Sequence, residues 1–156
     1  VKLKIFLRFV ALILLVLNIF FIFSFSGESA SESTKTSKQV TRTILELTYP
    51  DFKTLPSEKQ DEMVANLHNY FRTIAHFLEF CALGFLLAFN FALWDIKIKK
   101  RTIFSIVLAS LFAIGDEIHQ FFVPGRSFQI SDILIDSLGA TLGAFVLNIS
   151  SKIIKK

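Results

Sequence analysis

Four long apolar runs most strongly constrain how this 156-residue chain can fold. They cover residues 5–25, 74–94, 102–123 and 132–150. An α-helix rises about 1.5 Å per residue, so about 20 apolar residues cross the ~30 Å hydrocarbon core of a bilayer. Lipid offers the backbone no hydrogen-bond partners, and a helix satisfies its own backbone groups. We therefore predict an all-α polytopic membrane protein, with four transmembrane helices in one domain over residues 1–156.

The composition excludes several other classes of protein. Hydrophobic residues make up 53% of the chain and charged residues only 19%, which is incompatible with extensive disorder. The single cysteine, Cys81, excludes a disulfide-stapled module and a zinc finger. The first run is longer than the 7–15 apolar residues of a cleaved signal peptide, so we expect a retained anchor. The net charge of +4 is explained by topology, so we predict no nucleic-acid partner.

The positions of the basic residues predict the orientation in the membrane. Most of the 17 Lys and Arg residues stand in three short segments: Lys2, Lys4 and Arg8 at the start, Lys97, Lys99, Lys100 and Arg101 between the second and third runs, and Lys152, Lys155 and Lys156 at the end. Short loops rich in Lys and Arg stay in the cytoplasm. We therefore expect both termini inside, and residues 26–72 and the link near residues 121–130 outside.

The outer segment, residues 26–72, begins as a Ser-rich stretch that we interpret as a polar linker. Two amphipathic stretches follow: Val40, Ile44 and Leu47 recur at helical spacing, and a second apolar set runs from Met63 to Ile74. Ser57, with Gln60 three residues later, is a candidate N-cap for the second helix. We predict short amphipathic helices that lie on the outer membrane surface or cap the bundle.

Ionisable residues inside the predicted spans are the main functional signal. Each costs at least ~2.5 kcal/mol at mid-depth in a bilayer, so a purely structural bundle needs few of them. The second span begins with Arg72, His76 and Glu79 on one face; the third ends with Asp116, Glu117, His119 and Gln120; the fourth begins with Asp132 and Asp136. Gly139 and Gly143 continue the stripe of the fourth span and would let it approach a neighbour closely.

Depth along the helices places three carboxylates at one level. From the outer ends of their spans, Glu79 and Asp116 lie about 9 Å deep and Asp136 about 8 Å deep. We therefore expect these three groups to share a pocket that opens outward. His76, His119, Asp132 and Arg126 lie nearer the water, and Pro124-Gly125 predicts a tight turn just before Arg126.

Three blocks of the sequence resemble the VanZ-like membrane family. They are Arg72-x-x-Ala-His76-Phe-x-Glu79-Phe80-x-x-Leu83-Gly84, then Asp116-Glu117-x-His119-Gln120-x-x-x-Pro124-Gly125-Arg126-x-x-x-x-Ser131-Asp132, and Asp132-x-x-x-Asp136-x-x-Gly139-Ala-x-x-Gly143. The chain departs from the family pattern at Phe80, where Tyr is commoner, and at Asp136, where Asn is commoner. The resemblance covers nearly the whole chain. It implies a small multi-pass protein of the bacterial cytoplasmic membrane and a link to teicoplanin resistance, but it supplies no reaction.

The residues are compatible with several functions, and they do not decide whether the protein is an enzyme. An enzyme acting on an outer-leaflet lipid or a lipid-linked cell-envelope headgroup would use Glu79, Asp116, His76 and Asp132 for acid–base chemistry or a divalent metal. Its ligand-binding set would be Arg126, Arg72, Glu117, His119, Gln120 and Asp136, with the arginines holding a phosphate or carboxylate. A non-catalytic binder of an amphiphile such as a lipoglycopeptide would use the same pocket. A scaffold in which the polar cluster only locks the helices together, and a small transporter, are further alternatives.

Overall fold

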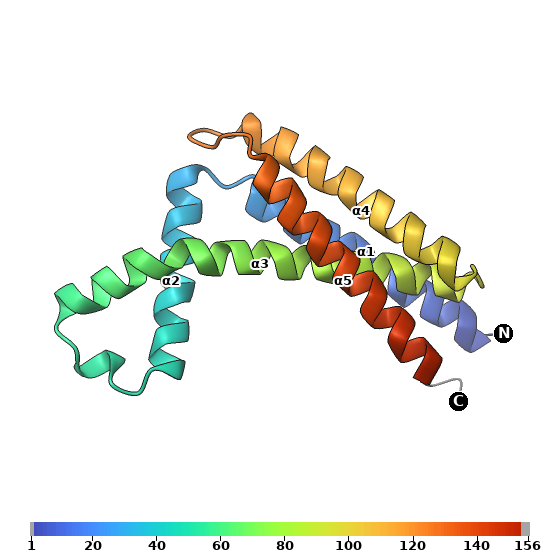
Figure 1. Cartoon of the computed structure of the whole chain (residues 1–156), viewed down its shortest axis with the longest axis horizontal. Coiled ribbons are helices and arrows are strands. Elements are labelled where there is room, and N and C mark those ends of the chain that lie inside the picture. Colours follow the sequence, from blue (N-terminus) through green and yellow to red (C-terminus); the bar gives the residue numbers. More distant parts are fainter. Residues whose placement is uncertain (1, 154–156) are drawn as a thin grey trace.

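The computed structural model describes residues 2–153, and every regular element in that range is helical (Figure 1). In chain order the elements are α1 (Lys2–Ser26), α2 (Ala30–Thr48), the short 3-10 helix η1 (Phe52–Thr54), α3 (Ser57–Leu93), α4 (Ile98–Phe121) and α5 (Ile130–Ile153). Four of them, α1, α3, α4 and α5, are long and apolar enough to cross a membrane. They contain the four predicted spans, except that α3 ends at Leu93 and α4 at Phe121, and they confirm the predicted fold class.

The second predicted span and the amphipathic stretch before it form one continuous helix. α3 has 37 residues, which corresponds to about 56 Å. Our separation of the two was wrong, because no Gly or Pro stands between Ser57 and Gly84 to end the helix where the chain leaves the lipid. Ser57 is also not the N-cap: Pro56 holds that position, and the Gln60 side chain donates to the Leu55 carbonyl at 2.9 Å.

The stretch predicted as a polar linker is largely helical. α2 begins at Ala30 with a reciprocal capping box, in which the Ser29 hydroxyl accepts from the Glu32 N–H and the Glu32 carboxylate accepts from the Ser29 N–H. Ser33, Ser37 and Thr41 are buried along one face of this helix. The Ser-rich composition suggested a linker, but here these small side chains form a buried helix face.

An extension formed by α2, η1 and the first turns of α3 projects from the helix bundle (Figure 1). α2 crosses α3, and the chain returns through η1 to the start of α3. Leu45, Phe52 and Val64 form a small separate core that holds the three elements together. The Arg42 guanidinium also pairs with Asp61, which joins α2 to α3 at the surface.

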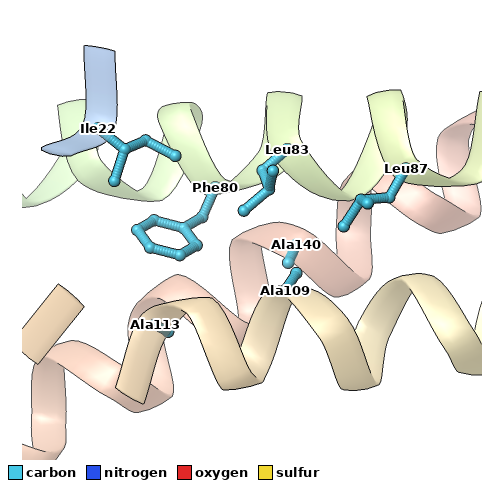
Figure 2. Packing of buried hydrophobic residues seen from close by; sticks show 7 residues of the cluster. All are labelled: Ile22, Phe80, Leu83, Leu87, Ala109, Ala113 and Ala140. Carbon is cyan, nitrogen blue, oxygen red and sulfur yellow. The ribbon is translucent and has the colours of Figure 1, made fainter. Parts of the chain in front are cut away.

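α3 lies at the centre of the bundle and packs against α1, α4 and α5. Figure 2 shows the shared core, in which Phe80, Leu83 and Leu87 of α3 face small alanines of α4 and α5. A Cβ atom added at Gly143 would lie 1.8 Å from the Cys81 carbonyl oxygen, and one at Gly139 would lie 2.3 Å from that of Phe77. The predicted close approach of α5 to a neighbour is therefore confirmed, and the neighbour is α3.

The start of α1, the link between α3 and α4, and the end of α5 lie at one end of the bundle (Figure 1). Lys4 Nζ is 2.6 Å from Asp95 Oδ2, and the Arg8 guanidinium donates to the Leu93 carbonyl at 3.0 and 3.1 Å. The Arg8 side chain also stacks over the Trp94 ring. The opposite end, where residues 122–129 join α4 to α5, is called the loop end below.

Candidate functional site

A polar cavity of about 200 Å³ lies at the loop end. Two segments far apart in sequence meet there: α3 forms one wall, and the region from the end of α4 to the start of α5 forms the other. Six of the predicted site residues line this cavity: Arg72, His76, Gln120, Arg126, Asp132 and Asp136.

Helical spacing and close packing bring these side chains together. Arg72 and His76 are four residues apart on α3, and Asp132 and Asp136 are four apart on α5, so each pair shares a helix face. The glycine contact between α5 and α3 lies directly below Asp136 along the α5 stripe. The contact therefore holds the two pairs on facing walls of the cavity.

A tight turn positions Arg126. The Arg126 N–H donates to the Val123 carbonyl at 3.1 Å, Pro124 occupies the second position, and Gly125 has a φ of 77°. This is the pattern of a type II turn, which needs a residue with positive φ at its third position. The predicted turn is confirmed, and it directs Arg126 toward the end of α1.

Protein partners hold the Arg126 guanidinium in place. Its Nη1 donates to Gln120 Oε1 at 2.8 Å, its Nε to the Glu28 carbonyl at 2.9 Å and its Nη2 to the Phe25 carbonyl at 3.2 Å. Burial lowers the pKa of this guanidinium. Arg126 therefore connects the loop to the C-terminal end of α1, where the helix carbonyls lack intrahelical partners.

Arg72 differs from Arg126 in having no partner among residues 2–153. Within the described part of the chain, its guanidinium makes no hydrogen bond and no ion pair, although the side chain is half-buried at the cavity wall. It lies within electrostatic range of Arg126. The cavity therefore has two cationic groups, one fixed by the protein and one available to a ligand.

Asp116 belongs to a buried hydrogen-bond network beside the cavity. It is only 1% exposed, and its Oδ2 accepts from Ser26 Oγ at 2.7 Å and from Gln120 Nε2 at 2.8 Å. Through Gln120 the network continues to Arg126. Ser26 was not among our predicted site residues. It could have been found from its place at the polar end of an apolar helix, within one α-helical turn of the loop carbonyls that Arg126 binds.

The Glu117 carboxylate is also buried and bound to a protein partner, so it is not open to the cavity. It is 2% exposed, and its Oε1 accepts from the backbone N–H of Gln129 at 2.6 Å. This contact joins α4 to the segment that leads into α5. Glu117, predicted to bind a ligand, is therefore not among the residues that line the cavity, and its carboxylate accepts from the loop backbone.

His119 is directed away from the cavity. It is exposed and packs edge-to-face against Phe23 of α1, with ring centroids 5.8 Å apart. A helix turns by about 100° per residue. The side chain of His119, three residues after Asp116, therefore points about 60° away from that of Asp116, whereas Gln120, four residues after it, points only about 40° away. The structure therefore does not bring His119, predicted to bind a ligand, to the lining of the cavity.

Two residues that line the cavity, Asp136 and His76, each have a buried polar atom with no hydrogen-bond partner among the described residues. Asp136 is 5% exposed, and its Oδ1 has no partner within the described residues. It lies within electrostatic range of Asp116, Asp132, Glu117 and Glu79. His76 Nδ1 is 3.5 Å from Glu79 Oε2, a distance that allows an ion pair, but the geometry is not that of a hydrogen bond.

A second, mostly apolar groove of about 150 Å³ adjoins the polar cavity. It lies between the end of α1, α2 and α3, and its lining includes Phe25, Val40, Phe71, Ala75 and Glu79. Arg72 and His76 line both spaces. Of the three carboxylates predicted to share one pocket, Glu79 and Asp116 lie within electrostatic range of Asp136, but the three have different surroundings: Asp136 lines the cavity, Glu79 the groove, and Asp116 lies in the buried network.

The cavity's own side chains favour binding through guanidinium and carboxyl groups. Within the described residues, no three His, Cys, Asp or Glu side chains are grouped so that they could hold a metal ion. The Arg72 guanidinium can bind a phosphate or carboxylate beside the fixed charge of Arg126, and Asp132 and Asp136 can accept hydrogen bonds from hydroxyl or amino groups. Such a set suits a polar headgroup that has both anionic and donor groups.

Comparison with known proteins identifies one relationship. The family model described as VanZ/LLP1 matches residues 9–151, which is nearly the whole chain, and this confirms the resemblance seen in the sequence. No curated protein and no solved structure matches the chain.

Proposed function

Because the chain belongs to the VanZ/LLP1 family, we propose that its loop end binds or processes the headgroup of an outer-leaflet amphiphile and so alters susceptibility to teicoplanin-type glycopeptides. The amphiphile is a membrane lipid, a lipid-linked cell-envelope molecule or a lipoglycopeptide. Family membership supports the link to teicoplanin, and the polar cavity supports the proposal of a headgroup site. The bacterial cytoplasmic membrane, with both termini inside, is part of the same proposal.

One observation supports this proposal above the others: Arg72, which has no partner among the described residues, lines a cavity that is also lined by Arg126, Asp132 and Asp136. A charged group near lipid is costly, and polar groups inside membrane proteins by default indicate a functional site. A phosphate or carboxylate between the two arginines would satisfy Arg72. The carboxyl groups of the opposite wall would then bind hydroxyl or amino groups of the same headgroup.

Processing of the headgroup would use groups at the cavity and groove. His76 lines both spaces and lies beside Glu79. Because it forms part of the cavity wall, it could exchange a proton with a bound headgroup. Asp132 is the less buried of the two α5 carboxyl groups and is the second candidate for acid–base chemistry. The sequence predicts Asp116 as a catalytic residue. We propose instead that its hydrogen bond to Gln120 holds Gln120, and through it Arg126, in position.

The test compares cells that produce the protein and its variants at equal membrane abundance. Arg72→Gln and Asp132→Asn remove charge from the cavity, so we expect each to abolish at least a fourfold change in teicoplanin susceptibility and to reverse any change in lipid or cell-wall precursor profile. Lys59→Gln and Glu62→Gln, on the exposed start of α3, are matched controls that should behave as wild type. Cavity variants that retain full effect would refute the headgroup site.

The buried network favours a second candidate, a scaffold without a ligand. Ser26, Asp116, Gln120 and Arg126 connect α1, α4 and the loop through hydrogen bonds that stabilise their arrangement. A scaffold predicts that Asp116→Asn impairs function as much as it impairs folding, while Arg72→Gln has no effect. The headgroup site predicts the opposite order, because Arg72 has no partner within the described residues.

A further inference from the structure

We infer that the amphiphile is a phosphate-bearing lipid whose phosphate lies at Arg72 and whose hydrocarbon chain leaves through the groove between α2 and α3. This inference rests on the proposed headgroup site and adds the class of ligand and the path of its chain. It starts from the shared lining of the two spaces: Arg72 and His76 stand at the boundary between the polar cavity and the apolar groove.

The order of chemical groups along the two spaces matches the order in a phospholipid. The cavity walls bear Arg126, Asp132 and Asp136, and the boundary bears Arg72. The groove presents mostly apolar surface, with hydroxyl and carboxyl side chains such as Ser37 and Glu79 among its lining residues. In a phospholipid the phosphate lies between the polar headgroup and the hydrocarbon chains. With the phosphate at Arg72, the rest of the headgroup therefore reaches the α5 carboxyl groups and the chain enters the groove.

The size and walls of the groove suit the first carbons of a chain. An apolar cavity of about 150 Å³ holds a body of roughly the size of benzene, so the groove accommodates about six carbons and leaves the rest of the chain to the bilayer. Phe71 and Ala75, four residues apart on α3, form one wall, and Val40 of α2 faces them. Each methylene buried there should strengthen binding about fourfold.

The unpartnered guanidinium argues for a phosphate at the boundary. A groove lined only by apolar side chains would bind any hydrocarbon chain, including that of a detergent or a neutral lipid. Arg72 adds a positive charge to the groove lining and makes no hydrogen bond or ion pair within the described residues, although the carboxyl groups of Glu28 and Glu79 line the same groove. An anion bound there gains a charge-assisted, bidentate contact that a neutral lipid does not.

Photolabelling of the full chain in maltoside micelles, which supply no phosphate, tests the inference. The probe is phosphatidylglycerol with a diazirine on an acyl carbon near the ester, and the matched probe is the corresponding diacylglycerol. We expect phosphatidylglycerol to label residues 33–40 and 71–79 at least tenfold more than diacylglycerol does. Equal labelling by the two probes, or labels confined to the outer faces of α1 and α4, would overturn the inference.

Two substitutions on α3 separate the chain path from lipid binding in general. Ala75→Phe fills the groove from an exposed position and should reduce this labelling at least tenfold without lowering the melting temperature. Ala82→Phe makes the same change two turns further along the same face, outside the groove, and should leave labelling unchanged.

The outcome for Arg72→Gln distinguishes failure of the inference from failure of the proposed function. If this change lowers phosphatidylglycerol binding while the labels fall outside the groove, the headgroup site stands and the chain path is wrong. If it leaves both binding and labelling unchanged, neither the headgroup site nor the chain path is correct. The inference requires that Arg72→Gln and Ala75→Phe each reduce labelling of the groove.

Discussion

Asp116 is almost completely buried, and its two oxygens have different environments. Oδ2 accepts two hydrogen bonds, whereas Oδ1 has no partner within the described residues. A buried polar atom without a partner carries a desolvation cost of about 1–3 kcal/mol, so the bonds that Oδ2 does make matter for folding. The hydroxyl of Ser26 is the donor that joins this carboxyl group to α1.

Ser26→Ala should therefore destabilise the protein. The substitution removes the donor at 2.7 Å and leaves Asp116 bonded to Gln120 alone. We expect a loss of about 1 kcal/mol, between the average of about 0.6 kcal/mol and the maximum of about 1.7 kcal/mol measured for side-chain hydrogen bonds between membrane helices. Thermal unfolding in detergent measures it. Ser57→Ala, at an exposed position, is the control, and equal stability of the two variants would contradict the prediction.

At this scale the sequence predicts which residues share a helix face better than it predicts their partners. Arg72, His76, Asp132 and Asp136 were identified from i, i+4 spacing, and all four line the cavity. Helical periodicity does not reveal which neighbouring segment a side chain meets. Glu117 instead receives a backbone N–H from the loop, a contact that depends on the path of residues 122–129.

At the scale of elements, glycines determine how closely α5 and α3 pack. The backbone of α5 approaches α3 so closely at Gly143 that a single methyl group would overlap the Cys81 carbonyl. Because neighbouring turns of α5 include Gly139 and Asp136, this approach also sets the distance between the cavity walls. Helices in membranes commonly use small residues to pack in this way.

Gly143→Ala should separate the two helices and destabilise the bundle. Overpacking a tight contact costs about 1–3 kcal/mol. Gly115→Ala on α4 is a matched control, because a Cβ there meets nothing within 4 Å. Alanine favours the helix over glycine by up to about 1 kcal/mol, so the control should be neutral or stabilising. Melting temperatures of the two variants measure the difference, and a Gly143→Ala protein as stable as Gly115→Ala would contradict the close packing.

Hydropathy predicted the spans but not the limits of the helices. An apolar run marks where lipid surrounds the chain, whereas a helix ends only where a cap or breaker ends it. α3 therefore continues through the predicted boundary near residue 74 to Ser57, where Pro56 precedes it. α2 begins at a capping box that the Ser-rich composition obscured, although Ser29 and Glu32 were visible at the required spacing.

At the scale of the whole molecule, the four candidate spans place the two described ends of the chain at the same end of the bundle. The contacts of Lys4 with Asp95 and of Arg8 with Leu93 join the start of α1 to the end of α3. The cavity, the groove and the extension lie at the opposite end, where the short link of residues 122–129 contains a single basic residue, Arg126, against four in the link of residues 97–101. This asymmetry is the physical basis of the predicted orientation, since short basic segments remain in the cytoplasm.

Accessibility labelling of single cysteines tests that orientation. In a Cys81→Ala background, Ser57→Cys lies on the extension and Lys99→Cys lies near the start of α4, and both positions are exposed. A membrane-impermeant maleimide should label Ser57→Cys in intact cells, and Lys99→Cys only after permeabilisation. The helix bundle fixes these positions at opposite ends, so only one of them can face outward. The reverse pattern would place the cavity beside the inner leaflet, where it could not reach outer-leaflet headgroups, and would contradict the proposed function while leaving the fold unchanged.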